Sequence, residues 1–89
     1  MAAAPADRPR VTLVGRPGCH LCDIAREVVA RVTAETGQAW WERNIDVEQD
    51  LHDRYWDRIP VLLVDGVELA AYRVEEDALR AALSALTST

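Results

Sequence analysis

The stretch Gly15-Arg16-Pro17-Gly18-Cys19-His20-Leu21-Cys22-Asp23 contains both cysteines of this 89-residue sequence. An apolar run at 11–14 precedes it, and a segment with the apolar spacing of a helix begins inside it. This order predicts a strand, a turn and then two thiols one helical turn apart. A helix N-terminus stabilises a thiolate through its unpaired N–H groups and the positive end of its dipole. The stretch therefore indicates a dithiol that undergoes disulfide exchange.

The length and composition are those of one small globular domain. A chain of this size can bury roughly 60–65% of the surface that it exposes when unfolded, which suffices for one modest core. The apolar fraction of 49% is ordinary for such a domain. We expect residues 1–9 to form a flexible N-terminal tail and residues 10–89 to form a single domain.

Several classes of protein are disfavoured by the same data. No apolar run approaches the ~20 residues that a membrane-spanning helix needs, and the first residues lack the apolar core of a secretion signal. We therefore expect a cytoplasmic protein without a membrane partner, and a monomer. In a reducing cytosol, a lone Cys-x-x-Cys is more often catalytic or metal-binding than structural. The net charge of −5 argues against nucleic acid as a partner, because phosphate binding needs clustered cations.

Strands and helices are predicted to alternate along the rest of the chain. Strands are expected at 10–15, 39–45, 61–64 and 67–70, and helices at 21–36, 50–55 and 74–86. Asp65-Gly66 suits the type I′ turn of a hairpin between the last two strands. The first two strands should be parallel, because they are joined by a right-handed crossover. The order β-α-β-α-β-β-α thus predicts an α/β fold with a mixed four-stranded sheet and helices on both faces.

The apolar pattern also predicts which side chains form the core. The stripe of the first helix is expected to consist of Leu21, Ile24, Ala25, Val28 and Val32, and Gly37 should end that helix. Alternation in the second strand places Trp41 and Ile45 on one face of the sheet and Trp40 on the other. The second helix has Leu51 and Tyr55 one turn apart. The buried stripe of the last helix is expected to be Leu79, Ala82, Leu83 and Leu86.

Taken together, the chain resembles glutaredoxin-like proteins of the thioredoxin superfamily, and most of all a group of short bacterial members. The resemblance covers about residues 11–86. It is carried by Cys19-His20-Leu21-Cys22, by Arg58-Ile59-Pro60-Val61 before the third strand, and by the Asp65-Gly66 turn. It implies a thioredoxin-like fold, thiol–disulfide oxidoreductase activity, and a cis Ile59–Pro60 bond that faces the cysteines.

The sequence also departs from ordinary glutaredoxins. Those proteins carry a Gly-Gly pair and an acidic segment that hold the glutamyl end of glutathione, whereas the corresponding stretch here is Ala70-Ala71-Tyr72-Arg73. We therefore expect glutathione to be handled less well than by an ordinary dithiol glutaredoxin, and a protein disulfide to be the better substrate. A thioredoxin proper would have Cys-Gly-Pro-Cys and a buried carboxylate on the preceding strand, and the apolar run at 11–14 has none.

The two cysteines are expected to differ in role. Cys19 is the predicted nucleophile, because the first sulfur at a helix start is exposed and close to free N–H groups. Cys22 is the predicted resolving thiol, because it sits one turn deeper, where burial raises a thiol pKa. Arg16 lies three residues before Cys19 and is expected to lower its pKa modestly. Asp23 either opposes this effect or serves only the electrostatics of the helix N-terminus.

Candidate substrate contacts follow from the resemblance. It implies that Arg16 binds the glycyl carboxylate of glutathione, and that Ile59 and Pro60 expose backbone groups to a peptide or to glutathione. Arg73 is a candidate partner for the glutamyl carboxylate. The expected substrates are a protein disulfide or a glutathione mixed disulfide, with glutathione as a candidate reductant and no bound cofactor or metal.

Other residues keep two interpretations each. His20 is either a proton donor or substrate contact, or an exposed spacer. Trp56 and Tyr72 either line the substrate groove or cap the core. His52 is interpreted as a surface residue of the second helix.

Alternatives to redox catalysis remain open at the level of sequence. The cysteine pair is half of a possible zinc site, for which only His20 and His52 are available as further ligands. A c-type haem site is excluded, because the histidine lies inside the pair. The remaining rivals are non-catalytic: an iron–sulfur cluster held between two protomers, or a redox-sensing interaction module.

Overall fold

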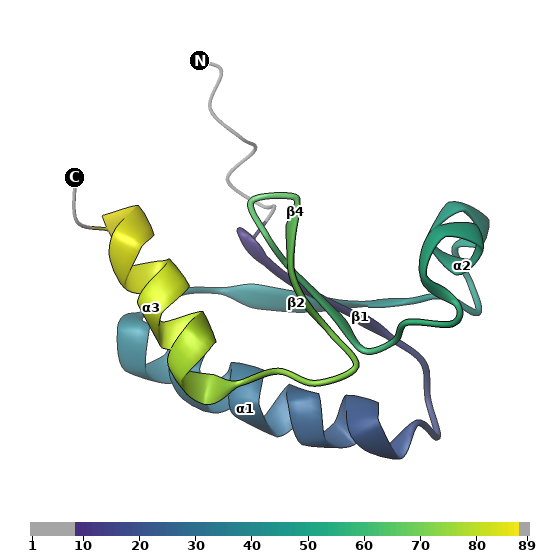
Figure 1. Cartoon of the computed structure of the whole chain (residues 1–89), viewed down its shortest axis with the longest axis horizontal. Coiled ribbons are helices and arrows are strands. Elements are labelled where there is room, and N and C mark those ends of the chain that lie inside the picture. Colours follow the sequence, from purple (N-terminus) through teal and green to yellow (C-terminus); the bar gives the residue numbers. More distant parts are fainter. Residues whose placement is uncertain (1–8, 88–89) are drawn as a thin grey trace.

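The computed structural model describes residues 9–87, and their side chains as far as residue 84. Within this part of the chain, the elements follow one another in the predicted order (Figure 1). The strands are β1 (Val11–Gly15), β2 (Trp40–Asn44), β3 (Val61–Val64) and β4 (Val67–Ala71), and the helices are α1 (His20–Thr36), α2 (Gln49–Tyr55) and α3 (Glu76–Thr87). Each boundary lies within two residues of its predicted position. Residues 1–8, most of the expected tail, lie outside the described residues.

The strands form one mixed sheet in the order β2-β1-β3-β4. β1 and β2 are parallel, whereas β1 with β3 and β3 with β4 are antiparallel. α1 and α3 cover one face of the sheet, and α2 lies against the other (Figure 1). The predicted α/β fold with helices on both faces is confirmed. None of the helices between residues 9 and 87 is long and apolar enough to cross a membrane.

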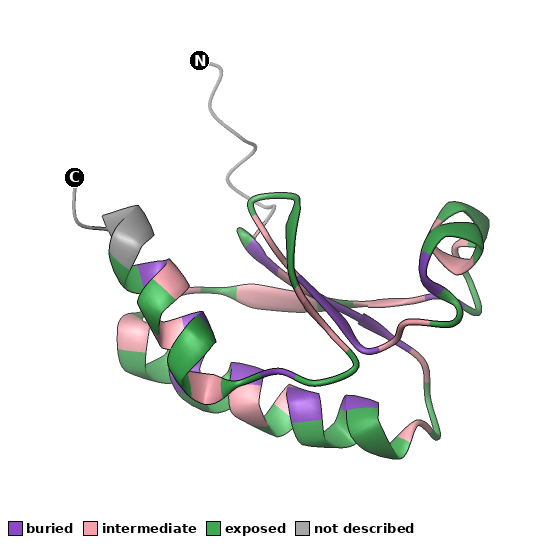
Figure 2. Ribbon diagram, viewed as in Figure 1, coloured by how far each residue is buried: buried purple, intermediate pink, exposed green. Residues whose placement is uncertain are grey.

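Two apolar clusters lie on opposite faces of the sheet, and alternation along β1 supplies both. The cluster under α1 and α3 consists of Val11, Leu13, Ala25, Val29, Val32, Leu62, Val74, Leu79 and Leu83. The cluster on the α2 side consists of Val14, Ile45, Tyr55 and Val61. Figure 2 shows that the buried residues gather in β1 and on the side of α1 that faces the sheet.

β2 follows the predicted alternation. Trp40 packs against the cluster under α1 and α3, and Ile45 belongs to the cluster on the α2 side. Trp41 shares a hollow with Val14 and Leu51 on the α2 side, and its indole Nε1 donates to the hydroxyl of Thr12 at 2.6 Å.

α1 buries a different stripe from the predicted one. The buried residues are Cys22, Ala25, Val29, Val32 and Thr33. Leu21 and Ile24 are 50% and 48% exposed, so the prediction that they face the core is wrong. The reason is that Cys22 packs against Gly15 of β1, which fixes the rotation of the helix one position beyond Leu21. Two apolar side chains are thereby left on the surface beside the cysteine pair.

The predicted turns and helix ends have the expected backbone geometry. Asp65 and Gly66 have φ of 53° and 81°, which are the positive angles that a type I′ hairpin turn needs. Gly37 has φ of 73° and ends α1, as predicted. The hairpin turn is fastened to the residue before β1, because the Arg10 guanidinium donates to both carboxylate oxygens of Asp65 at 2.9 and 3.0 Å.

α3 starts later than predicted. Val74 is buried but precedes the helix, which begins at Glu76. Leu79 and Leu83 are buried as expected and Ala82 is half-buried, whereas the side chain of Leu86 lies outside the described residues.

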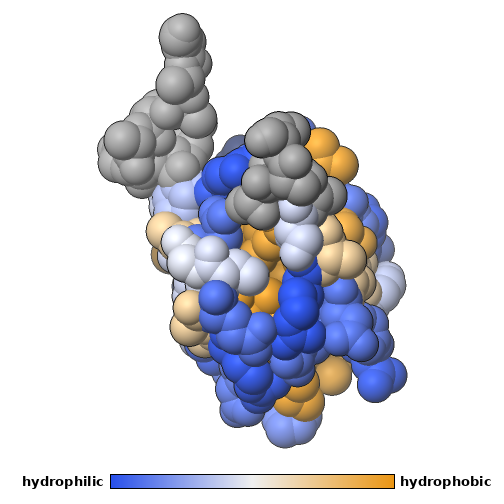
Figure 3. Space-filling model, turned by 90° about the vertical axis from the view of Figure 1, so that its left-hand side faces the viewer, coloured by the Kyte–Doolittle hydropathy of each residue, from blue (hydrophilic) through white to orange (hydrophobic). Residues whose placement is uncertain are grey.

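Surface ion pairs join α1 to α3. Arg31 of α1 reaches Glu76 of α3 at 2.8 Å, and Arg80 of α3 reaches Glu35 of α1 at 3.0 Å. Arg80 also pairs with Glu76 within α3 at 2.7 Å. Hydrogen bonding to Arg80 lowers the pKa of Glu76. Figure 3 shows the end of the molecule where these two helices meet, and hydrophilic residues cover most of the visible surface that is coloured there.

Candidate active site

The cysteine loop connects β1 to α1. Gly18 has φ of 81°, a left-handed conformation that favours glycine. Cys19 caps α1 with an extended backbone, φ −90° and ψ 114°. Its Sγ accepts a hydrogen bond from the backbone N–H of Cys22 at 3.2 Å. The first sulfur therefore occupies the position of an N-capping group and satisfies one of the N–H groups left free at the helix start.

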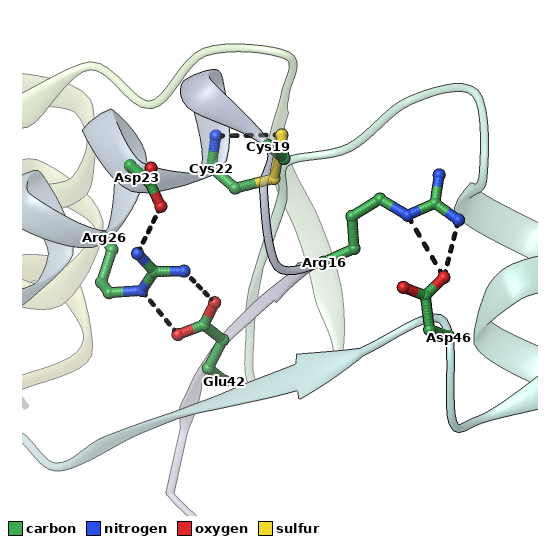
Figure 4. The surroundings of a disulfide bond; sticks show 7 residues. All are labelled: Arg16, Cys19, Cys22, Asp23, Arg26, Glu42 and Asp46. Atoms are coloured by element: carbon green, nitrogen blue, oxygen red, sulfur yellow. Dashed lines mark hydrogen bonds and ion pairs between the residues drawn. A yellow bond between two sulfur atoms is a disulfide. The ribbon is translucent and has the colours of Figure 1, made fainter.

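The two cysteines form a disulfide across one turn of α1, with their Cα atoms 5.1 Å apart (Figure 4). Cys22 is fully buried, whereas Cys19 is half-buried. The structure thus has the unequal exposure that the sequence predicted for the two sulfurs. Their assignment as nucleophile and resolving thiol stays a prediction.

Gly15 explains how Cys22 can lie so close to the sheet. A Cβ atom on Gly15 would lie 2.8 Å from the Sγ of Cys22 and 3.2 Å from its Cβ. The buried sulfur occupies the space that any other side chain at residue 15 would need. The sequence predicted only that Gly15 ends the first strand, and its packing role was missed because nothing local indicates which atom approaches it.

Arg16 lies in the cysteine loop, but its guanidinium is paired with Asp46, in the segment between β2 and α2. Its Nε and Nη2 donate to the same oxygen, Oδ1 of Asp46, at 3.2 and 2.6 Å. In Figure 4 the side chain of Arg16 extends toward Asp46 and away from the disulfide. Hydrogen bonding to Arg16 lowers the pKa of Asp46, so this carboxylate is ionised at neutral pH. Sequence reasoning missed Asp46, which is 30 residues away along the chain.

Asp23 is neutralised locally. Arg26 donates to Asp23 at 2.7 Å and to both carboxylate oxygens of Glu42 on β2 at 2.8 and 2.7 Å. These bonds, with those to Glu42 first, raise the pKa of Arg26. Gly15, Arg16, Arg26 and Glu42 border a hollow of about 410 Å³ next to the cysteine loop.

The Ile59–Pro60 bond is cis, as the resemblance implied. Pro60 is buried. Since Val14 pairs with Val61 across β1 and β3, Pro60 lies beside the end of β1 from which the cysteine loop starts. A direct contact with Cys19 stays a prediction. Among the described residues, no hydrogen bond involves the backbone of Ile59, so its groups are available to a bound strand.

The segment after β4 is tied to the cis-proline loop. The N–H of Tyr72 donates to the carbonyl of Pro60 at 2.8 Å and to that of Arg58 at 3.2 Å. Tyr72 has φ of 68°, an uncommon backbone conformation for a bulky residue. Tyr72 and Trp56 are both more than half exposed, so neither lies in the core. Arg73 is also on the surface, where it pairs with Glu75 at 3.1 Å.

The two histidines differ in their surroundings. His20 is exposed at the first position of α1. His52 lies on α2 with 41% of its side chain exposed, as expected for a surface residue. Its Nδ1 atom alone is buried; it has no hydrogen-bond partner in the described part of the chain and lies 3.7 Å from Oδ1 of Asp53. Between residues 9 and 87, no group of three or more His, Cys, Asp or Glu side chains is arranged to hold a metal ion.

A family model and related proteins match this chain over most of its length. Residues 10–84 match the family model described as glutaredoxin-like domain (DUF836). An uncharacterized protein of Mycobacterium tuberculosis is 34% identical over 85 residues, which cover 90% of this chain and 88% of the relative.

Solved structures also match this chain over most of its length. A structural-genomics target protein from X. campestris is 38% identical, with a TM-score of 0.70 over 84% of this chain and 96% of that protein. A mutant thioredoxin from Halobacterium salinarum is 26% identical, with a TM-score of 0.62 over 91% of this chain and 78% of that protein. The fold is thus thioredoxin-like, and the chain belongs to the glutaredoxin-like (DUF836) family.

Proposed function

We propose that this protein is a thiol–disulfide oxidoreductase that uses Cys19 and Cys22 as its redox dithiol. The observation that carries the proposal is the cysteine pair itself. One sulfur is accessible and caps a helix, and the other is fully buried within disulfide distance of it. The membership of the glutaredoxin-like family supports the same chemistry.

In the first step, the Cys19 thiolate attacks a substrate disulfide. The Cys22 N–H and the positive end of α1 stabilise the thiolate before it attacks. An S–S bond forms between Cys19 and one substrate sulfur, and the other substrate sulfur leaves as a thiolate.

In the second step, Cys22 loses its proton and attacks the Sγ of Cys19. The mixed disulfide breaks, the second substrate thiolate leaves, and the protein retains the Cys19–Cys22 disulfide. The substrate disulfide has gained two electrons and the protein dithiol has lost two. A second thiol compound, for which glutathione is the candidate, must return these electrons to the protein.

A protein disulfide is the proposed substrate, and a glutathione mixed disulfide is the weaker one. Leu21 and Ile24 are exposed apolar side chains on the first turns of α1, a feature typical of protein contact surfaces. The free backbone of Ile59, in the loop directly before β3, suits pairing with an extended segment of a partner. We propose that the protein acts in the cytoplasm as a monomer, without a bound metal or cofactor.

A single-turnover experiment tests the proposal. The pre-reduced protein is mixed with an equimolar protein disulfide such as insulin, and free thiols of both proteins are counted over time. We expect one substrate disulfide to be lost for each Cys19–Cys22 disulfide formed. Cys22→Ser should instead accumulate a mixed disulfide through Cys19, and Cys19→Ser should do neither. A wild-type protein that reduces no disulfide, but forms a stable visible chromophore on anaerobic reconstitution with iron and sulfide, would favour the cluster-binding rival.

A further inference from the structure

The cysteine loop is bordered by two arginines whose bonding differs. Arg26 uses three nitrogens to bind two carboxylates, those of Asp23 and Glu42. Arg16 uses two nitrogens to bind one oxygen of one carboxylate, that of Asp46. Arg16 therefore makes fewer bonds than Arg26, the other cation that borders the hollow. Figure 4 shows both arginines with their carboxylate partners.

Asp46 is held in place by its neighbours. Its backbone N–H donates to the side-chain oxygen of Asn44 at 2.7 Å. The preceding residue, Ile45, is buried, and its N–H donates to the carbonyl of Gly15 at 2.9 Å. This bond ties the segment that carries Asp46 to the end of β1, directly before Arg16. These bonds from backbone N–H groups hold Asp46 close to the start of the cysteine loop, within reach of the Arg16 guanidinium.

The linked charged side chains beside the disulfide carry a net negative charge. Two guanidinium groups, Arg16 and Arg26, are linked to three carboxylates, Asp23, Glu42 and Asp46. Removal of Asp46 alone would bring this set to electrical neutrality and would leave Arg16 without its carboxylate partner. An anionic ligand approaching Arg16 therefore meets a carboxylate that already occupies the guanidinium.

We propose that Asp46 is a specificity-determining residue that masks Arg16 from small thiols bearing a carboxylate, and so disfavours glutathione relative to protein disulfides. The inference rests on the proposed function, since it concerns which disulfide partner Cys19 accepts. The side chains of Arg16 and Asp46 are 40% and 44% exposed, so a ligand carboxylate has access to the pair and must compete with Asp46. Exposed ion pairs are weak, and their loss typically changes an equilibrium by about two- to fivefold.

The test measures mixed-disulfide formation at equilibrium in the Cys22→Ser background, where the second step cannot occur. The reduced variant is titrated with glutathione disulfide and, separately, with cystamine, and intact mass spectrometry gives the fraction of Cys19 modified. In each case the Cys19 thiolate takes one half of the reagent and releases the other half as a thiolate. Cystamine delivers a thiol that has an amine but no carboxylate.

We expect Asp46→Asn to raise the equilibrium constant for glutathione about two- to fivefold and not to raise that for cystamine. The gain should disappear when Arg16→Ala is also present, because the unmasked cation is then absent. Asp77→Asn is the matched control: it removes one carboxylate charge from α3, where Asp77 contacts Arg80 and not Arg16, and it should leave both constants unchanged.

Three results would overturn the proposal: no change in Asp46→Asn, an equal gain with both reagents, or a gain that persists without Arg16. These equilibrium constants are measured in a variant that cannot complete the reaction, so they do not depend on catalytic turnover. Failure of the proposed function would instead appear as a wild-type protein that reduces no protein disulfide, whatever residue stands at position 46.

Discussion

The two sulfur atoms of one disulfide lie in opposite surroundings. Cys22 is fully buried and packs on Gly15, so contact with the sheet fixes its position. Cys19 is half-buried, accepts an N–H from the helix start, and follows a loop that carries Arg16, whose partner Asp46 comes from the segment between β2 and α2. The difference teaches that packing positions the proposed resolving thiol, whereas hydrogen bonds and charges govern the proposed nucleophile.

The largest expected difference is in reactivity. Limited alkylation of the reduced protein at neutral pH should modify Cys19 first, because its sulfur is accessible and stabilised as a thiolate by the helix start. Peptide mass spectrometry after short exposure to iodoacetamide measures the order of labelling. Faster labelling of Cys22 would reverse the roles assigned to the two thiols.

The second prediction concerns the selectivity of the exposed Cys19 between glutathione mixed disulfides and protein disulfides. Glutathione mixed disulfides should be turned over ~10–150-fold less efficiently than by an ordinary dithiol glutaredoxin, since a lost charge-assisted hydrogen bond costs roughly 1.5–3 kcal/mol. Ala70 and Ala71 stand where such proteins carry the Gly-Gly pair, and Ala71→Gly should recover part of this loss by opening the backbone to close approach. The rate with a protein disulfide serves as the internal control. Turnover of glutathione mixed disulfides at an ordinary glutaredoxin rate would contradict the expectation.

The third prediction concerns the buried Cys22 and its packing on Gly15. Gly15→Ala should lower the free energy of unfolding of the oxidised protein by about 1–3 kcal/mol, because the new methyl group overlaps the sulfur of Cys22. Chemical denaturation measures this change. The same substitution in a Cys22→Ala background should cost less, since the sulfur is gone. An equal loss of unfolding free energy in both backgrounds would show that the methyl group does not act through the sulfur of Cys22.

The next prediction concerns the stability of the protein in acid, which depends on its surface ion pairs. Arginine partners lower the pKa of Asp46, Glu48, Asp65 and Glu76 below the ordinary values of 3.8 and 4.5. The unfolded chain therefore binds protons first as the pH falls below about 4.5, and stability should fall through that range while staying level near neutrality. The thermal midpoint between pH 7 and pH 3 measures this.

A matched pair of variants assigns the acid effect. Asp65→Asn should flatten the pH dependence, whereas Asp77→Asn, which removes a nearly fully exposed carboxylate, should leave it as it is. A midpoint that stays constant down to pH 3 would show that these ion pairs contribute nothing measurable.

The smallest effect is expected from Arg16. Arg16→Ala should raise the pKa of the Cys19 thiol only slightly, because Asp46 already neutralises the guanidinium. Thiolate absorbance of the reduced protein, titrated across pH, measures the change. Arg54→Ala, which removes an exposed cation from α2, is the control. A large rise would show that Arg16 acts on the sulfur despite its partner.

Patterns within single elements were enough to predict most of the fold. Asp65-Gly66 between two apolar runs defines its hairpin locally, and the Cys19–Cys22 spacing places both thiols at the start of α1. The stripe of α1 was wrong because Leu21 and Ile24 continue a helical pattern as well as Cys22 does. The choice between them depends on a contact with Gly15, which no helix-only pattern contains.

The electrostatics of the candidate site could not be predicted from the sequence. The pairing of Arg16 with Asp46 depends on how the segment after β2 is tied to the end of β1, through the bond from Ile45 to Gly15. Many carboxylates were equally plausible partners before that register was known. The positive φ of Tyr72 was missed for a similar reason, because it depends on hydrogen bonds to the cis-proline loop.

The direction of β1 has a practical consequence for handling this protein. The chain enters the sheet at Arg10, which is clamped to Asp65 in the hairpin turn, and the cysteine loop leaves from the opposite end of the strand (Figure 1). The five residues of β1 separate these two ends by about 13 Å. An affinity tag, fluorophore or electrode linker attached upstream of Arg10 therefore joins the sheet at the end away from Cys19. Immobilisation through that side leaves the redox end facing the solution.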